Sequence, residues 1–269
     1  MMLSIESPAN ERVRKWKKLA GHSCEENGNR IFFVEGEHMT GEALSRGCVS
    51  ELAVCADKQE KYGALLHEAE GKNIRIYSVT EAICDAVCTS KTPQGIFCVC
   101  SLPAADAVAC RRVVVLEGVQ DPGNVGTILR TMDAAGFDLL IMDRKCANPY
   151  SAKALQATMG AVFRIPVRVC DDLCDELERM KKEQGTRMMA GDLKGKHLFE
   201  RGENAESMCI LIGNEGNGIS ERARSLADLP VRIPMPGKAE SLNAGVAAGI
   251  LIYDVLRKDQ NEPVTDGIE

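Results

Sequence analysis

In the second part of the chain, short apolar runs are separated by longer segments in which apolar and polar residues are mixed. The run RVVVLEG from residue 112 is rich in β-branched residues and shows no alternation, which is typical of a central strand in a parallel sheet. Similar short runs alternate with longer segments of helical periodicity. Strands are predicted near 112–117, 138–142, 164–169, 187–191, 208–213 and 230–234, and helices near 124–135, 151–162, 172–184, 220–227 and 241–257. This order predicts an open, largely parallel sheet covered by helices.

The first part of the chain predicts a smaller α/β domain of its own. Its pattern gives an amphipathic helix within 4–20, strands at 31–35, 51–55, 74–79 and 95–100, and helices at 39–44 and 58–70. The stretch SLPAADAVACRR that follows is small and weakly patterned, so it is interpreted as a linker. The predicted organisation is an N-terminal domain over 1–103, a linker over 104–110, a second domain over 111–258 and a flexible polar tail over 259–269.

Composition and charge describe an ordinary globular protein. Hydrophobic residues make up 45% of the chain, and the formal net charge is −6. A negative chain argues mildly against binding nucleic acid through bulk electrostatics, but it permits a local basic patch. The start of the chain is polar and no run of about 18 apolar residues occurs, so neither an export signal nor a membrane span is expected. Twelve cysteines without C-x-x-C spacing indicate free thiols in a reducing cytoplasm and no metal site.

The predicted first helix is basic on its polar side. Its candidate RNA-contacting residues, grouped around the single tryptophan of the chain, are Arg12, Arg14, Lys15 and Lys18. Two readings stay open. Charge runs are usually solvated faces, with apolar residues such as Trp16 turned inward. Alternatively, the same arginines and lysines contact the phosphates of a nucleic-acid backbone.

Three loops share a polar, glycine-rich character, and each follows a predicted strand of the second domain. Ligands bind at the carboxyl ends of the strands in such sheets. The first loop, VQDPGNVGTILRT, contains Asn124, which together with Thr127 is a candidate helix cap, and Arg130. Arg130 suits either a surface salt bridge or a guanidinium directed at an anion.

The second and third loops add a carboxylate and a group of polar side chains. In GNEGNGIS, Gly213, Gly216 and Gly218 flank Glu215, and the order G-x-x-G-x-G differs from the dinucleotide-binding G-x-G-x-x-G. In MPGKAESLN, Ser241 is expected to cap the last helix. Asn243 is expected in the first turn of that helix, where backbone N–H groups favour polar ligands.

Taken in this order, NVGTILRTMDAAGF, LIGNEGNGIS and IPMPGKAESLNAGVAAGILIYDVLR resemble the three signature motifs of the SpoU-type (TrmH-type) RNA ribose 2′-O-methyltransferases. SPANERVRKWKKL, FFVEGEHMTGEAL and TPQGIF resemble the ribosomal-protein-like substrate-binding domain of the rRNA enzymes, and KALQATMGAVFRIPV also has a counterpart. The resemblance covers essentially the whole chain. Departures from the family pattern are Met132, Ala244-Gly245, Asn217 and Gln156, and the last two lower the positive charge near the expected RNA face.

The resemblance implies an α/β domain with a deep trefoil knot that binds S-adenosylmethionine and forms a homodimer through its C-terminal domain. The implied catalytic residues are Asn124, Arg130, Glu215, Ser241 and Asn243. The implied cofactor-binding residues are Gly213, Asn214, Gly216, Gly218, Ile233, Met235 and Leu242. The implied reaction is transfer of the sulfonium methyl to a ribose 2′-hydroxyl.

Ribosomal RNA is favoured over tRNA as the substrate because of the extra N-terminal domain. Two other classes remain in competition. A catalytically silent RNA-binding protein of the same fold is opposed by the intact polar positions, such as Asn124 and Asn243. A nicotinamide-dependent oxidoreductase is opposed by the glycine order of the second loop.

Overall fold

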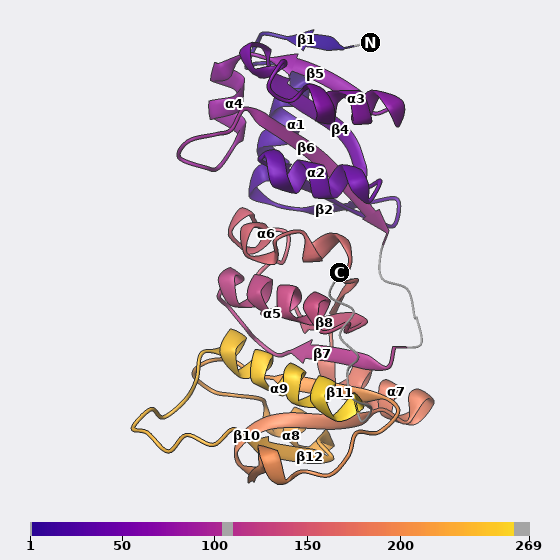
Figure 1. The fold of residues 1–269 in the computed structure, drawn as a ribbon, viewed down its shortest axis with the longest axis vertical. Coiled ribbons are helices and arrows are strands. Elements are labelled where there is room, and N and C mark those ends of the chain that lie inside the picture. The colour runs from indigo at the N-terminus through magenta and orange to yellow at the C-terminus, as the bar shows by residue number, and fades with distance from the viewer. Residues whose placement is uncertain (1, 104–109, 261–269) are drawn as a thin grey trace. The chain divides into compact units, whose positions relative to one another are not determined.

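The computed structural model describes residues 2–103 and 110–260, and the chain divides into two compact units (Figure 1). The first unit contains residues up to 103 together with 148–164, and the second contains 110–147 together with 165–260. The sequence assigned 148–164 to the second domain. Here this segment packs within the first unit, because Leu155, Val162 and Phe163 enter the same core as Phe32. The proposed linker and tail lie largely outside the described residues.

The first unit is built on a mixed six-stranded sheet. Its strands are β1 (Leu3–Ile5), β2 (Cys24–Glu26), β3 (Asn29–Glu35), β4 (Val49–Cys55), β5 (Arg75–Val79) and β6 (Ile96–Pro103). Their order in the sheet is β1-β5-β4-β6-β3-β2, with β1, β5 and β4 parallel and the remaining pairs antiparallel. Its helices are α1 (Glu11–Gly21), α2 (Glu37–Ser45), α3 (Gly63–Gly71), α4 (Glu81–Val87) and α6 (Ala152–Thr158), with short 3₁₀ turns at Ala56–Lys58 and Ala161–Phe163.

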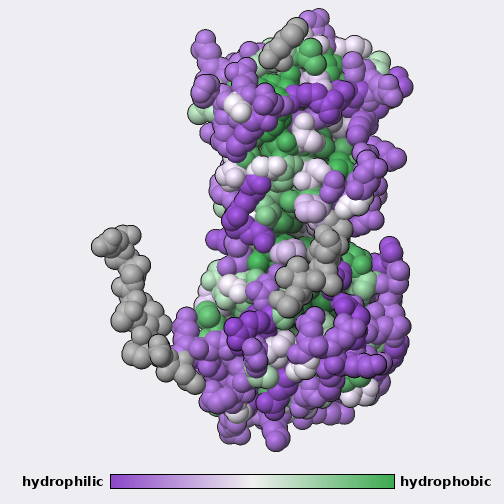
Figure 2. Space-filling view, turned by 90° about the vertical axis from the view of Figure 1, so that its right-hand side faces the viewer, coloured by the Kyte–Doolittle hydropathy of each residue, from purple (hydrophilic) through white to green (hydrophobic). Residues whose placement is uncertain are grey.

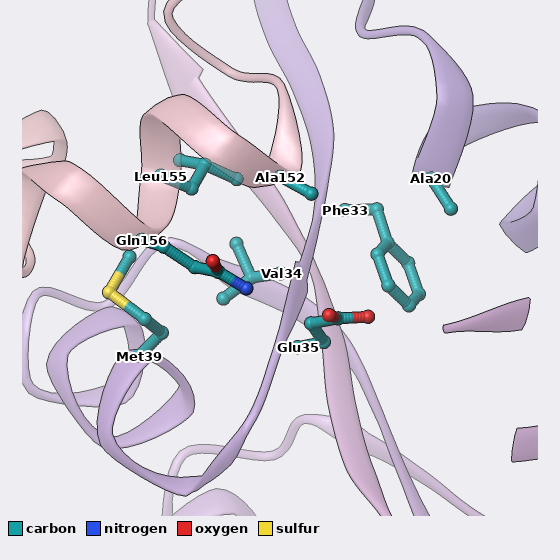
Figure 3. Close-up of a pocket in the computed structure, with 8 residues that line it drawn as sticks. All are labelled: Ala20, Phe33, Val34, Glu35, Met39, Ala152, Leu155 and Gln156. Carbon is teal, nitrogen blue, oxygen red and sulfur yellow. The ribbon is translucent and has the colours of Figure 1, made fainter. Parts of the chain in front are cut away.

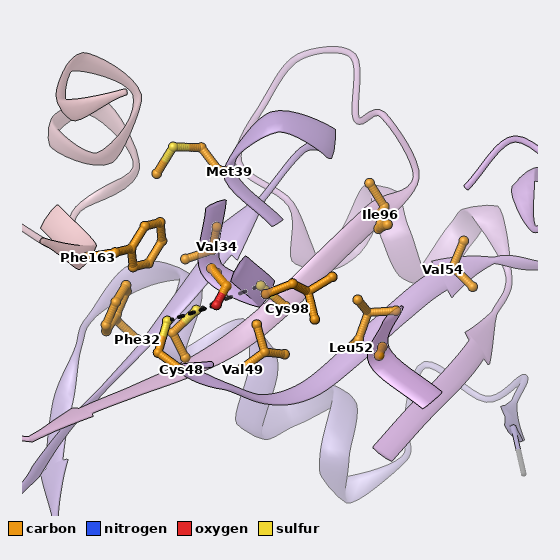
Figure 4. Close-up of a cluster of buried hydrophobic side chains, with 14 of the residues drawn as sticks. Phe32, Val34, Met39, Cys48, Val49, Leu52, Val54, Ile96, Cys98 and Phe163 are labelled. Carbon is orange, nitrogen blue, oxygen red and sulfur yellow. Dashed lines mark hydrogen bonds between the residues drawn. The ribbon is translucent and has the colours of Figure 1, made fainter. Parts of the chain in front are cut away.

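Successive side chains along each strand of the first unit point to opposite faces of the sheet, so they form two separate hydrophobic cores, one on each face. Along β3, Phe32 and Val34 point to one face, where they meet Phe163 (Figure 4). Phe33 points to the opposite face, where Trp16 of α1 is fully buried. The helix α1 is therefore amphipathic as predicted.

The second unit is built on a six-stranded sheet in which all the strands are parallel, which confirms the predicted parallel α/β sheet. Its strands are β7 (Arg112–Leu116), β8 (Leu139–Asp143), β9 (Val167–Cys170), β10 (Arg187–His197), β11 (Met208–Ile212) and β12 (Leu229–Arg232). They lie in the order β12-β10-β11-β7-β8-β9. Its helices are α5 (Pro122–Ala134), α7 (Leu173–Gln184), α8 (Glu221–Leu226) and α9 (Ala244–Asp259), with a 3₁₀ turn at Leu198–Glu200.

Helices cover both faces of this parallel sheet. Val113 and Val115 of β7 point to a core shared with Leu177 of α7 and Ala223 of α8. The helices α5 and α9 pack on each other, and α9 also packs on β11 (Figure 1). Both faces of the sheet are thus buried, as the uninterrupted apolar strands predicted.

Ion pairs fix the C-terminal half of α9. Arg201, in the loop after β10, donates from Nε to Asp254 of α9, and both side chains are essentially fully buried. Near the end of the helix, Arg112 donates from Nε and Nη2 to the two carboxylate oxygens of Asp259. These contacts tie α9 to the loop after β10 and to the start of β7.

Several predicted element boundaries were wrong, and hydrogen bonds explain two of them. The helix predicted within 4–20 begins only at Glu11, because residues 3–5 pair with β5 as the strand β1. Neither Asn124 nor Thr127 caps α5, since the Asp121 carboxylate accepts from Gly123 N and Pro122 occupies the first turn. The short elements β2 and α4 were not predicted at all.

Hydrophilic residues cover most of the visible surface of each unit (Figure 2). Among the described residues, seven large apolar side chains are exposed: Leu3, Met159, Val169, Leu193, Phe199, Val246 and Tyr253. A search of the same residues finds no helix with the length and apolar character that a membrane crossing requires.

Candidate functional site

The three polar loops meet at the carboxyl edge of the parallel sheet in the second unit. The strands that precede the first two loops, β7 and β11, are neighbours in the sheet, and β10 alone separates β11 from β12, which precedes the third. Hydrogen bonds join the first two loops directly. Asn214 Nδ2 donates to Gly118 O at 2.8 Å, and Ser220 N donates to the Glu117 carboxylate at 2.7 Å.

A chain of side-chain hydrogen bonds then links all three loops. Asn124 Nδ2, on α5, donates to Glu215 Oε1 at 2.8 Å. Asn243 Nδ2, at the start of α9, donates to Asn124 Oδ1 at 2.9 Å. Asn124 is buried, whereas Glu215 and Asn243 are exposed. Three of the five predicted catalytic residues are therefore brought together, one from each loop.

The other two predicted catalytic residues, Arg130 and Ser241, take no part in this series of hydrogen bonds. Arg130 is exposed near the middle of α5. Ser241 is exposed in the third loop and does not cap α9, contrary to the prediction. Asn243 is the cap, because its Oδ1 accepts from Gly245 N at 2.9 Å and from Val246 N at 3.2 Å. Asn243 thus uses its oxygen to start α9 and its amide nitrogen to hold Asn124.

Small residues let α5 and α9 approach closely behind this chain. A Cβ built on Gly245 would lie 3.2 Å from Asn243 Oδ1 and 3.4 Å from Thr127 Cγ2. One turn further along, a Cβ on Gly249 would lie 3.9 Å from Thr131 Cγ2. The small apolar character of α9 therefore has a packing reason, which is the close contact with α5.

The second loop is folded into a tight turn that exposes the backbone. Asn214 and Gly218 exchange backbone hydrogen bonds of 3.0 and 2.9 Å, and Asn214 Oδ1 accepts from Gly216 N at 2.8 Å. Gly218 has a φ of +66°, which favours glycine. A Cβ on Gly213 would overlap the backbone of Gly218, so glycine is required there to close the turn. Asn214, predicted as a cofactor contact, here organises the loop through its side chain.

The residues predicted to bind S-adenosylmethionine belong to the second and third loops. The side chains of Ile233, Met235 and Leu242 are half-buried, so each leaves part of an apolar surface exposed. A Cβ on Gly218 would meet nothing within 4 Å, which leaves open space beside the turn. The exposed carboxylate of Glu215 complements a positively charged sulfonium. The predicted cofactor residues thus offer apolar side chains and open backbone, and the predicted catalytic residue Glu215 adds a negative charge beside them.

Sequence reasoning missed two acidic residues that shape the edge. Asp121 starts α5, and an Asp before Pro-Gly is a recognisable cap signal. Asp143, buried at the end of β8, accepts from Gly118 N at 3.1 Å and also from Lys145 N and Cys146 N. Nothing in the local sequence distinguishes Asp143 from a surface aspartate.

The predicted RNA-contacting residues on α1 divide into two groups. Arg12 donates to Glu51, and Lys15 lies 3.6 Å from the carboxylate of Glu26. Arg14 and Lys18 are exposed. The buried Trp16 and the exposed Arg14 and Lys18 agree with a solvated face, and contact of these residues with RNA phosphates stays a prediction.

All twelve cysteines of the chain are free thiols, as predicted. Burial raises the pKa of the Cys146 thiol, near the first loop, to about 12, with a further contribution from Asp143. Burial likewise raises the pKa of Cys170 to about 11. Across the ranges 2–103 and 110–260, no group of three or more His, Cys, Asp or Glu residues is arranged to hold a metal ion.

A pocket lies in the first unit, between β3 and α6 (Figure 3). Phe33, Met39 and Leu155 line its apolar part, and Glu35 and Gln156 its polar part. The Glu35 carboxylate is already engaged, because it accepts from Thr89 N at 2.8 Å and from the hydroxyls of Thr89 and Ser90. The pocket contains no residue of the three loops.

Known proteins share this architecture over nearly the full chain. The crystal structure of an rRNA methyltransferase from Sinorhizobium meliloti superposes with a TM-score of 0.81 at 25% identity, over 95% of this chain and 98% of that one. The SpoU methyltransferase AviRb from Streptomyces viridochromogenes, in complex with AdoMet, gives a TM-score of 0.79 at 25% identity, over 94% and 99% of the two chains. A 23S rRNA (guanosine(2553)-2′-O)-methyltransferase, RlmP of Bacillus subtilis, is 36% identical over 94% of this chain and 98% of its own length.

Two family descriptions match the two parts of the sequence. The SpoU rRNA Methylase family matches residues 111–253, and the MRM3-like substrate binding domain matches residues 10–98. Together with the fold and the three loops, these matches define the class of protein as an RNA methyltransferase with a substrate-binding domain. The chain belongs to the SpoU rRNA methylase family.

Proposed function

We propose that this protein transfers a methyl group from S-adenosylmethionine to a ribose 2′-hydroxyl of ribosomal RNA. The observation that supports it best is the hydrogen-bonded chain Glu215–Asn124–Asn243, which joins the three loops at one edge of the sheet. The match of residues 10–98 to a substrate-binding domain and the similarity to a 23S rRNA 2′-O-methyltransferase favour ribosomal RNA over tRNA.

The cofactor is proposed to lie against the second and third loops. Gly213, Asn214, Gly216 and Gly218 provide the turned backbone, and Ile233, Met235 and Leu242 provide apolar contacts. When bound, S-adenosylmethionine supplies an already activated methyl group. The protein must then place the ribose hydroxyl close to that methyl and in line with the bond that breaks.

In the proposed reaction the 2′-oxygen would bond to the methyl carbon, the carbon–sulfur bond would break with its electron pair left on the sulfur of S-adenosylhomocysteine, and the hydroxyl proton would pass to solvent water. The arginine side chain is not deprotonated in proteins, so no role as a base is proposed for Arg130. Its exposed guanidinium is proposed to bind an RNA phosphate and to stabilise the oxygen as negative charge develops. Asn124 and Asn243 are proposed to hold Glu215 in place, and Ser241 is proposed to contact the RNA or the methionine part of the cofactor.

A homodimer through the C-terminal unit is part of the proposal. Val246 and Tyr253, seven residues apart and so on the same side of α9, are each about half exposed, at 52% and 50%. An exposed apolar stripe on a helix next to the site suits a contact with a second copy. The trefoil knot expected from the resemblance is likewise proposed for the segment that includes α9.

Calorimetric titration of the protein with S-adenosylmethionine, with NAD as control, tests the cofactor assignment. Saturable binding of S-adenosylmethionine alone is expected. A folded protein that binds RNA but no S-adenosylmethionine would support the silent RNA-binding alternative. Binding of NAD instead would support an oxidoreductase.

A further inference from the structure

A buried carboxylate in the first unit holds two arginines from separate elements. Glu51 of β4 is 7% exposed. Its Oε1 accepts from Nη1 of Arg12 on α1 and lies 3.5 Å from Nη2 of Arg75 on β5. Its Oε2 accepts from Nε1 of Trp16 at 2.9 Å. The carboxylate is therefore fully engaged, whereas each arginine uses one of its nitrogens.

The surroundings fix the guanidinium of Arg12 and place that of Arg75 beside the same carboxylate. Arg12 stacks over the ring of Tyr77, with its Cζ 4.8 Å from the ring centroid. Arg75 is the direct register partner of Glu51 on the neighbouring strand. The two arginine side chains keep 32% and 61% of their surface exposed, so most of their N–H donors remain accessible to a ligand.

The local charge favours an anion at this place. Two cations share a single carboxylate oxygen, so one positive charge is uncompensated within the group. The helix α1 carries five basic residues against one acidic residue, although the chain as a whole has a net charge of −6. A second anion between the two guanidinium groups would relieve their mutual repulsion.

We infer that Arg12 and Arg75, oriented by Glu51, form a clamp for a backbone phosphate of the RNA substrate. The inference rests on the proposed function, because it takes RNA as the ligand. Guanidinium groups bind phosphate oxygens through paired N–H donors, and a fork held in place loses little freedom on binding. Phosphate contacts of this kind fix the position of an RNA rather than read its sequence. The clamp would therefore set where the RNA lies on the first unit.

Equilibrium binding of the full chain to protein-free 23S ribosomal RNA, measured at several salt concentrations, tests the clamp. Arg75→Ala is the main variant, because Arg75 is exposed and lies outside the core. It is expected to weaken binding about tenfold at low salt, as for the loss of one charge-assisted hydrogen-bonded pair. The slope of log affinity against log salt should fall by about 0.7 to 0.9, which corresponds to one phosphate contact.

Two further variants separate the clamp from a general charge effect. Arg75→Lys should keep the salt slope but recover only part of the affinity, because a point charge does not replace a planar fork. Arg46→Ala is the matched control, since Arg46 is an exposed arginine of the same unit at the end of α2. It should leave affinity and slope unchanged. Binding of S-adenosylmethionine and thermal unfolding of Arg75→Ala should match the wild type.

The outcomes distinguish the clamp from the proposed function. If the wild type binds and methylates the RNA while Arg75→Ala keeps the same affinity and salt slope, the clamp is overturned and the function stands. If Arg46→Ala weakens RNA binding as much as Arg75→Ala, the loss of affinity reflects the removal of any positive charge from the first unit, and the clamp is overturned as well. A wild type that neither binds nor methylates RNA overturns both.

Discussion

Replacing Asn124 by aspartate tests the hydrogen-bonded chain at the site. The change keeps the shape of the side chain but turns the donor that faces Glu215 Oε1 at 2.8 Å into an oxygen. Two carboxylates about 4 Å apart repel by about 4 kcal/mol at an effective dielectric constant of about 20. The lost hydrogen bond to a charged group adds about 1.5–3 kcal/mol. Because Glu215 is exposed and can turn away into solvent, we expect a net loss of about 2–4 kcal/mol in the free energy of unfolding at pH 7.

The effect of Asn124→Asp should depend on pH with a defined sign. Repulsion between the two carboxylates favours a proton shared by the pair in the folded state, so the folded state binds more protons than the unfolded state. The free energy of unfolding of the variant, relative to wild type, therefore falls as pH rises. Most of the deficit should be present at pH 7 and much of it should disappear near pH 5, closer to the range in which free carboxyl groups titrate.

Urea unfolding at both pH values measures this difference. Asn217→Asp is the control, because Asn217 is exposed in the same loop as Glu215 and the substitution adds the same single negative charge. Its stability should stay within about 0.5 kcal/mol of wild type. An Asn124→Asp protein as stable as wild type at pH 7, or equally destabilised at both pH values, would refute the role given to the Asn124–Glu215 contact.

Three further predictions concern the loops and the last helix. Arg130→Lys should lose most of the methyl-transfer activity, because a point charge does not replace a bidentate guanidinium fork, and near-normal turnover would contradict the role of Arg130. Its unfolding midpoint should stay unchanged because the side chain is exposed. Gly213→Ala should abolish binding of S-adenosylmethionine in calorimetry, since the added Cβ overlaps the backbone of Gly218, and unchanged affinity would show that the turn does not form the pocket. Arg201→Ala should cost about 3–5 kcal/mol in urea unfolding, because it leaves the buried Asp254 carboxylate without its main partner, and a loss below about 1 kcal/mol would count against that pairing.

Hydrophobic patterning was sufficient to predict the parallel sheet of the second unit. The strands β7, β8 and β11 are short and apolar, and the helices α5 and α7 that follow β7 and β9 have 13 and 12 residues, so period and length agree for these elements. The mixed sheet of the first unit was harder to predict. The strand β1 has three residues and forms by pairing with β5, a contact distant in sequence that no local pattern reports.

The site could be predicted by residue type but not by connectivity. The motifs identified Asn124, Glu215 and Asn243, yet the hydrogen bonds between them span 91 and 119 residues of sequence. The cap of α9 was assigned to Ser241 because serine before an apolar helix is a common start signal. Asn243 takes that place instead, and its amide nitrogen also reaches Asn124, an interaction that only the packing of α9 on α5 creates.

The chemical position of the transferred methyl tests the central claim most directly. The full chain would be incubated with S-adenosylmethionine labelled in its methyl group and with either protein-free 23S ribosomal RNA or tRNA, and the RNA would then be hydrolysed in alkali. A ribose 2′-O-methyl group blocks cleavage at its own phosphodiester, so the account predicts label in an alkali-resistant dinucleotide from ribosomal RNA. Label in mononucleotides would place the methyl on a base. Label in tRNA alone would identify tRNA, and not ribosomal RNA, as the substrate. Either result would contradict the account.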